Sequence, residues 1–453
     1  MSRAAGILLG AIAVAAPLHV VPAFPAIALF AVWCLRFLKS PRRPHPAALV
    51  LVVNYLYWSI SLAATAAGGS TVASYAFMRW QSRLPVGFLV YLALSTPHLG
   101  VTDRLARRLL LLFLAASSAV VLLGVAQLLL GAPYQAVVSI GPYAEFEAGP
   151  VVSRFGQQWF FGFHRSHVAA GAFYLIPALV GLSLFLFGPP GRTCRLSALV
   201  AFAFASWGLV FTKARGAWIG FALAVGVALI LSLQPAAPTR RGRRSGRVAS
   251  LLAVGAVLLI VLLTVPDVLA RVGWTATWTV RDLGPAASAP PPSGENLAVA
   301  TMRDRLLYWR AALALFGERP LFGIGLGQYP YRFARDYSAG LQLPWPHPEA
   351  YHAHSSYLHV LAELGIVGLG LFLLFWALTL RALISALRTH HRGTLPWAFA
   401  FGVILAVVAE LVVALVDYNL ASPTAMLPLG LLVGLALSLA GCPVPVGRPS
   451  SAG

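Results

Sequence analysis

The sequence HVAAGAFYLIPALVGLSLFLFG, residues 167–188, is a continuous apolar stretch without a single Asp, Glu, Lys or Arg. A helix needs about 20 apolar residues to cross the hydrocarbon core of a bilayer, and it satisfies its own backbone hydrogen bonds there. The stretch therefore predicts a membrane-spanning helix.

Similar apolar runs recur on both sides of this one. Together they number twelve, at 4–20, 23–38, 47–65, 84–99, 108–131, 167–188, 196–212, 216–233, 248–269, 355–380, 396–416 and 424–441. The composition agrees, because 59% of the 453 residues are hydrophobic and only 10% are charged, whereas a water-soluble domain has roughly a quarter charged residues. We predict an all-α, polytopic membrane protein with about 12 transmembrane helices and a large periplasmic loop carrying short helices.

The basic residues indicate an orientation. The first run follows Arg3 and resembles a signal peptide, but no clear cleavage site precedes a soluble domain, so we expect it to be retained. With the N-terminus inside, alternate loops carry most Lys and Arg, as the positive-inside rule requires. The cytoplasmic set then has nineteen members: Arg3, Arg36, Lys39, Arg42, Arg43, Arg104, Arg107, Arg108, Arg192, Arg195, Arg240, Arg241, Arg243, Arg244, Arg247, Arg381, Arg388, Arg392 and Arg448. They bracket the spans and form no single module, which favours topology and lipid signals over binding of nucleic acid.

The other 14 basic residues fall on the outer side, where the positive-inside rule gives no reason for them. Most lie at 132–166, at 270–354 and at the outer end of the seventh run. The segment 270–354 is too long for a structureless connection, which indicates a function. It includes GPAASAPPPSGEN (284–296), which is not expected to pack. Its residues 301–317 place Leu306, Trp309, Ala312, Leu313 and Phe316 on one stripe, which predicts an amphipathic helix at the outer interface.

These features divide the chain into four parts. We expect transmembrane helices 1–9 in 1–269, the periplasmic loop in 270–354, transmembrane helices 10–12 in 355–441 and a cytoplasmic tail in 442–453. Cys34, Cys194 and Cys442 show no CxxC spacing, and no phosphate-binding glycine motif opens a helix after a strand. We therefore expect no metal and no cofactor.

Three outer segments carry candidate chemistry. In TKARGAWIG (212–220), Lys213 and Arg215 lie between two spans. Such an arginine either snorkels to position the helix end or offers a planar fork of donors to a lipid-linked phosphate. In MRDRLLYWR (302–310), Arg305 and Trp309 share a helical face, which is either a solvated charged face or part of a site.

The third segment is YHAHSSYLHVLAELGIVGLG (351–370). His352 and His354 precede the tenth span, where histidine often serves as a polar cap, and their spacing argues against a shared metal. Glu363 lies inside the span, where carboxylates are rare and generally have partners. We leave open whether it belongs to a packing network or supports a site.

These residues resemble a family. His354-Ser355, nine residues and then Gly365-Ile-Val-Gly368 is similar to the His-[Asn/Ser/Gln]-x9-Gly-x-x-Gly signature of the O-antigen ligase and O-antigen polymerase superfamily. Arg305…Trp309 with RPLFGIGLGQY (319–329) resembles the run that leads to that histidine, and TKARGAW resembles the element that carries the family's first essential arginine, here Arg215. A weaker likeness at 153–170 has His164 and His167 where Asn is expected, and nothing is carried over from it.

The resemblance implies a metal-independent, inverting glycosyltransferase that acts at the periplasmic side of the bacterial inner membrane. The donor would be a glycan on undecaprenyl diphosphate, and the acceptor a glycolipid or glycan hydroxyl, with lipid A-core as the ligase acceptor. Arg215 and Arg305 would bind the diphosphate, and His354 would be the general base, since a histidine with an ordinary pKa of about 6.5 can take a proton at neutral pH. Lys213, Trp309, His352 and Glu363 would give support.

Other functions remain open. An O-antigen or exopolysaccharide polymerase would use the same donor and the same signature, and a protein O-glycosyltransferase is a further option. A multispanning secondary transporter would suit the apolar runs equally well, although transporters usually place polar residues at the midplane in broken helices. We favour the ligase because the arginine and histidine elements both match.

Overall fold

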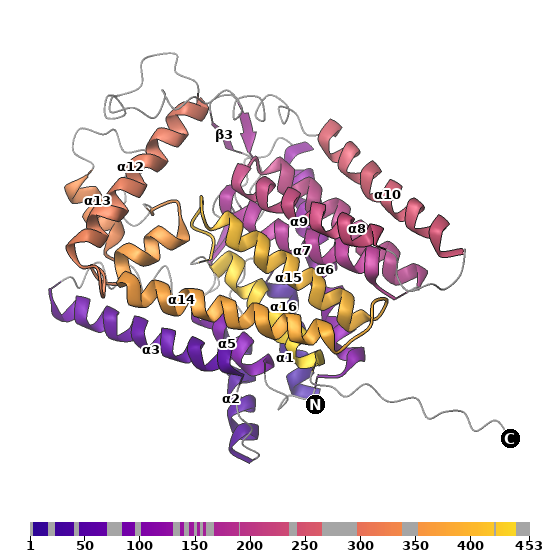
Figure 1. Ribbon diagram of the computed structural model, residues 1–453, viewed down its shortest axis with the longest axis horizontal. Coiled ribbons are helices and arrows are strands. Elements are labelled where there is room, and N and C mark those ends of the chain that lie inside the picture. Colours follow the sequence, from indigo (N-terminus) through magenta and orange to yellow (C-terminus); the bar gives the residue numbers. More distant parts are fainter. Residues whose placement is uncertain are drawn as a thin grey trace.

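The computed structural model describes residues 3–16, 23–39, 45–69, 84–95, 101–129, 136–139, 145–148, 152–154, 157–159, 167–189, 191–234, 242–264, 297–337, 352–420 and 423–440. Its helices are α1 (Arg3–Ala15), α2 (Ala23–Lys39), α3 (Pro46–Ala67), α5 (Leu84–Leu94), α6 (Asp103–Leu129), α7 (His167–Phe187), α8 (Arg192–Phe211), α9 (Arg215–Leu233), α10 (Gly242–Thr264), α12 (Leu297–Glu318), α13 (Tyr329–Asp336), α14 (Ser356–Arg388), α15 (Leu395–Val413) and α16 (Pro423–Ala440). Figure 1 shows them as a bundle with α12 and α13 at one end.

Two small antiparallel hairpins lie between α6 and α7. Strand β1 (Ala136–Ser139) pairs with β2 (Glu145–Ala148), and β3 (Val152–Arg154) pairs with β4 (Gln157–Trp159). Among the described residues they are the only departure from the predicted all-α chain. Both fall in the outer segment expected at 132–166, so they do not interrupt a predicted span.

Every predicted apolar run coincides with a helix. Within the described residues, seven helices are long and apolar enough to cross a membrane, at Pro46–Ala67, Arg104–Gly124, His167–Phe187, Arg192–Phe211, Arg215–Leu233, Ser356–Arg388 and Leu395–Val413. Shorter apolar helices cover Ala5–Ala15, Val248–Leu263 and Ala425–Leu439. The protein is therefore a helical, multi-pass membrane protein, while the count of about 12 spans stays a prediction.

Helix α7 is the centre of the bundle. It packs against α8, α9, α15 and α16, and almost all of its apolar window is buried. Close approach depends on small residues: a Cβ at Gly181 would lie 2.9 Å from the Ala198 carbonyl oxygen of α8. On the α15 side, the Ser183 hydroxyl donates to the Ala398 carbonyl at 2.6 Å. Small residues and interhelical hydrogen bonds are the usual means of helix association within a bilayer.

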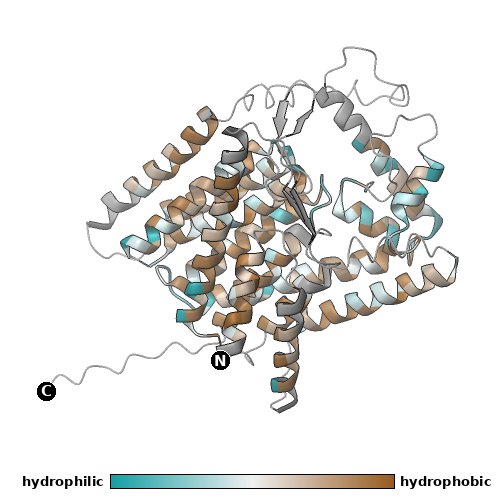
Figure 2. Cartoon of the chain, turned by 180° about the vertical axis from the view of Figure 1, so that it is seen from behind, coloured by the Kyte–Doolittle hydropathy of each residue, from teal (hydrophilic) through white to brown (hydrophobic). Residues whose placement is uncertain are grey.

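The outer faces of the bundle are apolar. On α3 the exposed residues include Leu49, Val52, Val53, Leu56 and Ile60, and on α9 they include Ile219, Leu223, Val227, Ile230 and Leu233. Figure 2 shows apolar residues along the bundle helices and hydrophilic residues at α12 and α13. A face of this kind suits contact with lipid chains, because the tails are as apolar as the side chains that meet them.

Helix α14 is broken. The sequence predicted one continuous span at 355–380, but Gly365 adopts φ 65° and ψ −166°, and the helix then runs on to Arg388. The Gly-rich segment 319–328 lies along the break: the Ile324 and Gly325 amides donate to the carbonyls of Ala362 and Glu363, each at 3.0 Å. Backbone groups freed by the break are thereby hydrogen-bonded, which a broken helix within a membrane protein requires.

Helix α3 supports the same break. The Tyr57 hydroxyl donates to the Leu364 carbonyl at 2.8 Å, the Ser61 hydroxyl accepts from the Leu326 amide at 3.1 Å, and the Asn54 side chain donates to the Leu371 carbonyl at 3.0 Å. The Gly-rich segment 319–328 is thus hydrogen-bonded to α14 on one side and to α3 on the other.

The predicted amphipathic helix at 301–317 is present as part of α12, but its buried stripe differs. Tyr308, Ala311, Ala312 and Leu315 are buried, whereas Leu313 is half exposed. The difference arises because α12 packs on α14 and α13, and these helices determine which of its residues are buried. The stretch 284–296, the tail 442–453 and His164 lie outside the described residues.

Candidate active site

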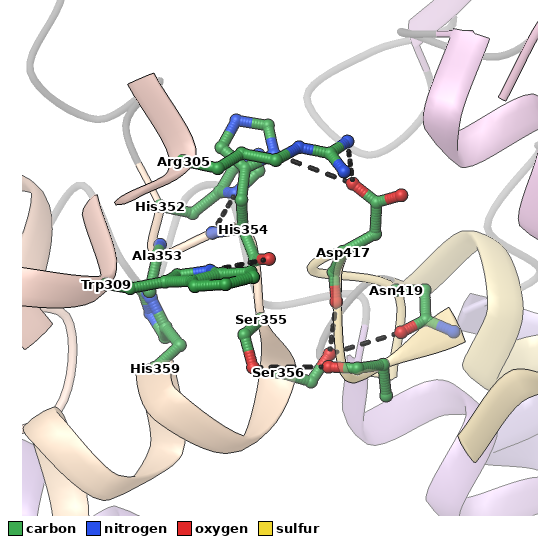
Figure 3. A network of polar contacts seen from close by, with 11 residues as sticks. Arg305, Trp309, His352, Ala353, His354, Ser355, Ser356, His359, Asp417 and Asn419 are labelled. Atoms are coloured by element: carbon green, nitrogen blue, oxygen red, sulfur yellow. Dashed lines mark hydrogen bonds and ion pairs between the residues drawn. The ribbon is translucent and has the colours of Figure 1, made fainter. Parts of the chain in front are cut away.

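The start of α14 is tied to the segment that follows α15. Ser355 is the N-cap of α14, and its side chain accepts from the Leu358 amide. The Ser356 amide donates to the carbonyls of Ala414 and Asp417, at 2.9 and 3.1 Å. The Ser356 hydroxyl also contacts the Asn419 side chain at 3.2 Å. The connection 414–420 therefore lies directly beside Ser355 and Ser356, at the start of α14 (Figure 3).

Asp417 is the centre of a polar cluster on this connection. Its Oδ1 lies 3.0 Å from a terminal guanidinium nitrogen of Arg305 on α12 and 3.5 Å from Nδ1 of His354. The carboxylate is buried, while Arg305 and His354 keep 14% and 28% of their side-chain surface exposed. One face of the cluster therefore stays accessible to a ligand.

The cluster keeps Asp417 charged. Burial raises the pKa of the Asp417 carboxyl, but the Arg305 guanidinium, His354 and His167 together outweigh burial and hold the pKa below its usual value. Among the described side chains, Nε of Arg305 and Nδ1 of His354 are buried without a hydrogen-bond partner. Because such atoms are costly to leave unsatisfied, the Arg305 Nε marks a place that a polar ligand can complete, whereas the His354 Nδ1 faces Asp417 Oδ1 at 3.5 Å.

The backbone at His354 is strained and is held by two hydrogen bonds. Its φ is 47°, in the left-handed region that a side chain with a Cβ rarely adopts. The His354 amide donates to His352 Nδ1 at 3.2 Å, and the His354 carbonyl accepts from the Trp309 indole at 3.3 Å. Strain of this kind costs about 1–3 kcal/mol and persists where the surroundings over-determine it, often at functional sites.

His352 is fixed in a different way from the predicted polar cap. Its ring lies against His354 and stacks on Tyr418, with centroid distances of 4.2 and 5.1 Å. Burial, followed by the charges of His354, His359 and Arg305, lowers the pKa of His352 well below its usual value. A neutral His352 can accept a hydrogen bond from the His354 amide. His352 therefore supports the backbone before α14 and does not cap the helix.

The start of α9 meets the same carboxylate. A Cβ at Gly216 would lie 2.8 Å from Asp417 Oδ2, so only a glycine allows this approach. Arg215, the first residue of α9, directly precedes this contact. Lys213 is buried with φ 59°, in the tight connection between α8 and α9. The site thus joins Arg305, His354 and the first turn of α9, where the helix dipole also favours an anion.

Glu363, within α14, belongs to a second polar cluster, separate from the cluster around Asp417. It is buried, and its carboxylate accepts from the amides of Gly327 and Tyr329, each at 2.9 Å. His359 Nε2 lies 3.4 Å from Glu363 Oε1. Glu363 therefore has the partners that an intramembrane carboxylate was expected to need, and it does not reach Asp417 directly.

The sequence placed Arg305, Trp309, His352, His354 and the Arg215 segment at one outer site, and the structure brings these segments together. Sequence reasoning missed the contacts of Asp417, although an acid at the outer end of a span, on the side that carries many arginines, was a detectable signal. It also missed His359 and Asn419, whose contacts depend on tertiary packing. Among the described residues, no group of three or more His, Cys, Asp or Glu side chains could hold a metal ion.

Fold and site define a class: a polytopic helical membrane protein with a cationic cluster and a histidine at one end of its bundle. Residues 200–373 match the family model described as O-antigen ligase. This stretch contains Arg215, Arg305 and His354, and the match supports the resemblance to the O-antigen ligase and O-antigen polymerase superfamily that the motifs indicated. No curated protein matches the chain.

Proposed function

We propose that the protein transfers an undecaprenyl-diphosphate-linked polysaccharide to a sugar hydroxyl, with inversion and without a metal, as an O-antigen ligase that acts on lipid A-core. The family supports a membrane glycosyltransferase of the ligase or polymerase type and lipid-linked glycan substrates. The donor, the acceptor, the site residues and the periplasmic face of the bacterial inner membrane are our proposals.

In the proposed reaction, the acceptor oxygen attacks the anomeric carbon of the donor sugar. A bond from that carbon to the acceptor oxygen forms, the bond to the diphosphate oxygen breaks, and the diphosphate leaves with the electron pair. His354 takes the acceptor proton at Nε2. Asp417 Oδ1, 3.5 Å from Nδ1, draws closer to accept from Nδ1–H as the imidazolium forms, which keeps Nε2 available as the base and stabilises the imidazolium.

The departing diphosphate gains negative charge, which two arginines can meet. Arg305 keeps a buried Nε without a partner among the described residues, so it can donate to a phosphate while a terminal nitrogen stays on Asp417. Arg215 begins α9, where the helix dipole adds to the positive potential. Interactions that strengthen as charge develops lower the barrier, because they favour the transition state over the ground state.

The observation that carries the proposal is the convergence of Arg305, His354 and the first turn of α9 on one buried carboxylate. A structural ion pair alone would explain Arg305 and Asp417. It would not explain a histidine in strained backbone at the same carboxylate, with its ring still partly exposed.

The test is glycan transfer in proteoliposomes that contain the purified protein, a lipid-linked glycan donor and lipid A-core. We expect His354→Ala, Arg215→Ala and Arg305→Ala each to lower the transfer rate by at least about 10²-fold. Matched controls are Arg335→Ala, whose guanidinium contacts only exposed Asp336, and His391→Ala, an exposed histidine after α14. Both controls should transfer at the wild-type rate.

Near-normal transfer by His354→Ala and Arg215→Ala would refute the proposal. A strict need for a divalent metal, seen as activity lost on EDTA treatment, would refute its metal-independent part.

Product analysis separates ligase from polymerase. The ligase reaction yields glycan attached to lipid A-core, whereas a polymerase yields longer chains that remain on the lipid carrier. Chain extension on the carrier, with no product on lipid A-core, would replace the ligase with the polymerase.

A further inference from the structure

A row of polar contacts connects the Gly-rich segment 319–328 to the backbone next to His354. Glu363 accepts from the Gly327 and Tyr329 amides through different oxygens. Its Oε1 also faces His359 Nε2 at 3.4 Å. On the other side of the same ring, His359 Nδ1 accepts from the Ala353 amide at 3.4 Å (Figure 3). Ala353 is bonded directly to His354.

The partners of His359 fix the position of its proton. An amide N–H faces Nδ1, so this nitrogen must be an acceptor, and a carboxylate faces Nε2, so this nitrogen must be the donor. The opposite tautomer would place the carboxylate against a lone pair and one N–H against another, and a ring turned over would present C–H groups to both partners. Glu363 therefore selects the orientation and tautomer of His359, in the manner of the carboxylate that orients a catalytic histidine.

The ring has little freedom to adopt another position. His359 is 6% exposed and Glu363 is 2% exposed. Tyr418 and Tyr329 pack against the imidazole, with centroid distances of 4.4 and 5.0 Å. Tyr418 also follows Asp417 directly in the chain. The Tyr418 ring therefore links His359 to the cluster around Asp417.

On the basis of the proposed function, we infer that Glu363 and His359 are positioning residues for transfer. Glu363, anchored by the Gly-rich segment, orients His359. His359 holds the Ala353 amide, and the loop thereby keeps His354 in the left-handed conformation that points its imidazole at Asp417. Neither residue touches the reacting atoms.

Two substitutions at His359 separate positioning from packing. The Asn amide can occupy the place of Nδ1 and accept from Ala353, whereas the Gln amide reaches the place of Nε2 and can contact only Glu363. We expect His359→Gln and His359→Leu to lower kcat by about 10- to 10²-fold, because a displacement of about 1 Å at a reacting group costs this much. The KM for the donor should stay within about twofold, since the diphosphate ligands are unchanged. His359→Asn should recover most of the wild-type kcat.

A second measurement does not depend on the transfer reaction. Diethyl pyrocarbonate modifies exposed imidazoles, and the rate at His354 can be followed by mass spectrometry of the full-length protein in detergent. We expect a faster rate in His359→Gln and His359→Leu, and the wild-type rate in His359→Asn. If the Leu variant is not recovered from membranes, the Asn and Gln variants, both polar, carry the comparison.

Equal kcat and equal His354 modification in the Asn and Gln variants would overturn the inference. If the wild-type protein transfers no glycan, the proposed function is refuted. The rates of His354 modification would still decide whether His359 positions the loop.

Discussion

A single carboxylate organises the candidate site. Asp417 is buried, pairs with Arg305 at 3.0 Å and meets His354 at 3.5 Å. We expect Asp417→Asn to lower kcat by at least about 10²-fold, because the amide cannot stabilise the imidazolium. We also expect a loss of about 2 kcal/mol in the free energy of unfolding at pH 7, since a hydrogen bond to a charged group is removed. Transfer kinetics and thermal unfolding in detergent measure the two effects.

The stability effect has a defined pH dependence. The folded protein holds the pKa of Asp417 below its unfolded value, so the charged carboxylate stabilises the fold above that unfolded value, and the benefit is lost as pH falls through the folded pKa. Wild type and Asp417→Asn should therefore differ at neutral pH and converge in acid. Glu318→Gln is the matched control, because it removes an exposed carboxylate whose surface ion pair with Arg332 contributes little to stability. A constant difference at all pH values would contradict the role given to the charge.

At this scale the sequence reveals residues whose type is unusual for their place. Arg305 and His354 stand out because cations are disfavoured at outer span ends, and because the motif around them is specific. His359 does not stand out, since a histidine within an apolar helix is compatible with many environments. Its role depends on Ala353 and Glu363 meeting the two sides of one ring, which only the folded backbone determines.

Among the elements, the broken helix α14 shapes the site. A Cβ at Gly365 would lie 2.3 Å from the Leu321 carbonyl oxygen, and its φ of 65° is unfavourable for any other residue. We expect Gly365→Ala to lower the free energy of unfolding by about 3 kcal/mol or more, from backbone strain and the forced separation of the segment 319–328. Gly370→Ala, in the same helix with open space at its Cβ, should be neutral or raise stability by up to about 1 kcal/mol. Thermal midpoints of the two variants make the comparison, and equal midpoints would show that the break carries no strain.

Apolar periodicity predicts where α14 lies but not that it breaks. The run 355–380 reads as one span, and the glycines of the signature are compatible with an intact helix. The break becomes visible only with its partners, the Gly-rich segment and Tyr57 of α3, which are distant in the sequence. The sequence of α12 likewise does not reveal its partners. Its apolar stripe was predicted to face the membrane interface, whereas the helix packs on α13 and α14.

For the whole molecule, the positions of the helices follow from hydrophobicity alone, because each apolar run must hydrogen-bond its own backbone inside the bilayer. The arrangement of the bundle does not follow, since lipid-facing and partner-facing sides are equally apolar. Helix α7 illustrates this: its mean hydropathy of 2.1 is close to the 2.2 of α9, yet α7 is buried in the centre while α9 exposes Ile219, Leu223 and Val227.

The orientation of the molecule is the last prediction. The distribution of basic residues places α13 outside and the connection after α14 inside. With Cys34, Cys194 and Cys442 replaced by Ser, a membrane-impermeant maleimide should label Arg335→Cys in cells with a permeable outer membrane. It should label His391→Cys only after the inner membrane is disrupted; both positions are exposed, so reactivity itself does not limit labelling. The opposite pattern would place His354 on the cytoplasmic side. The site would then face the wrong leaflet for the proposed donor, even if every contact around Asp417 were correct.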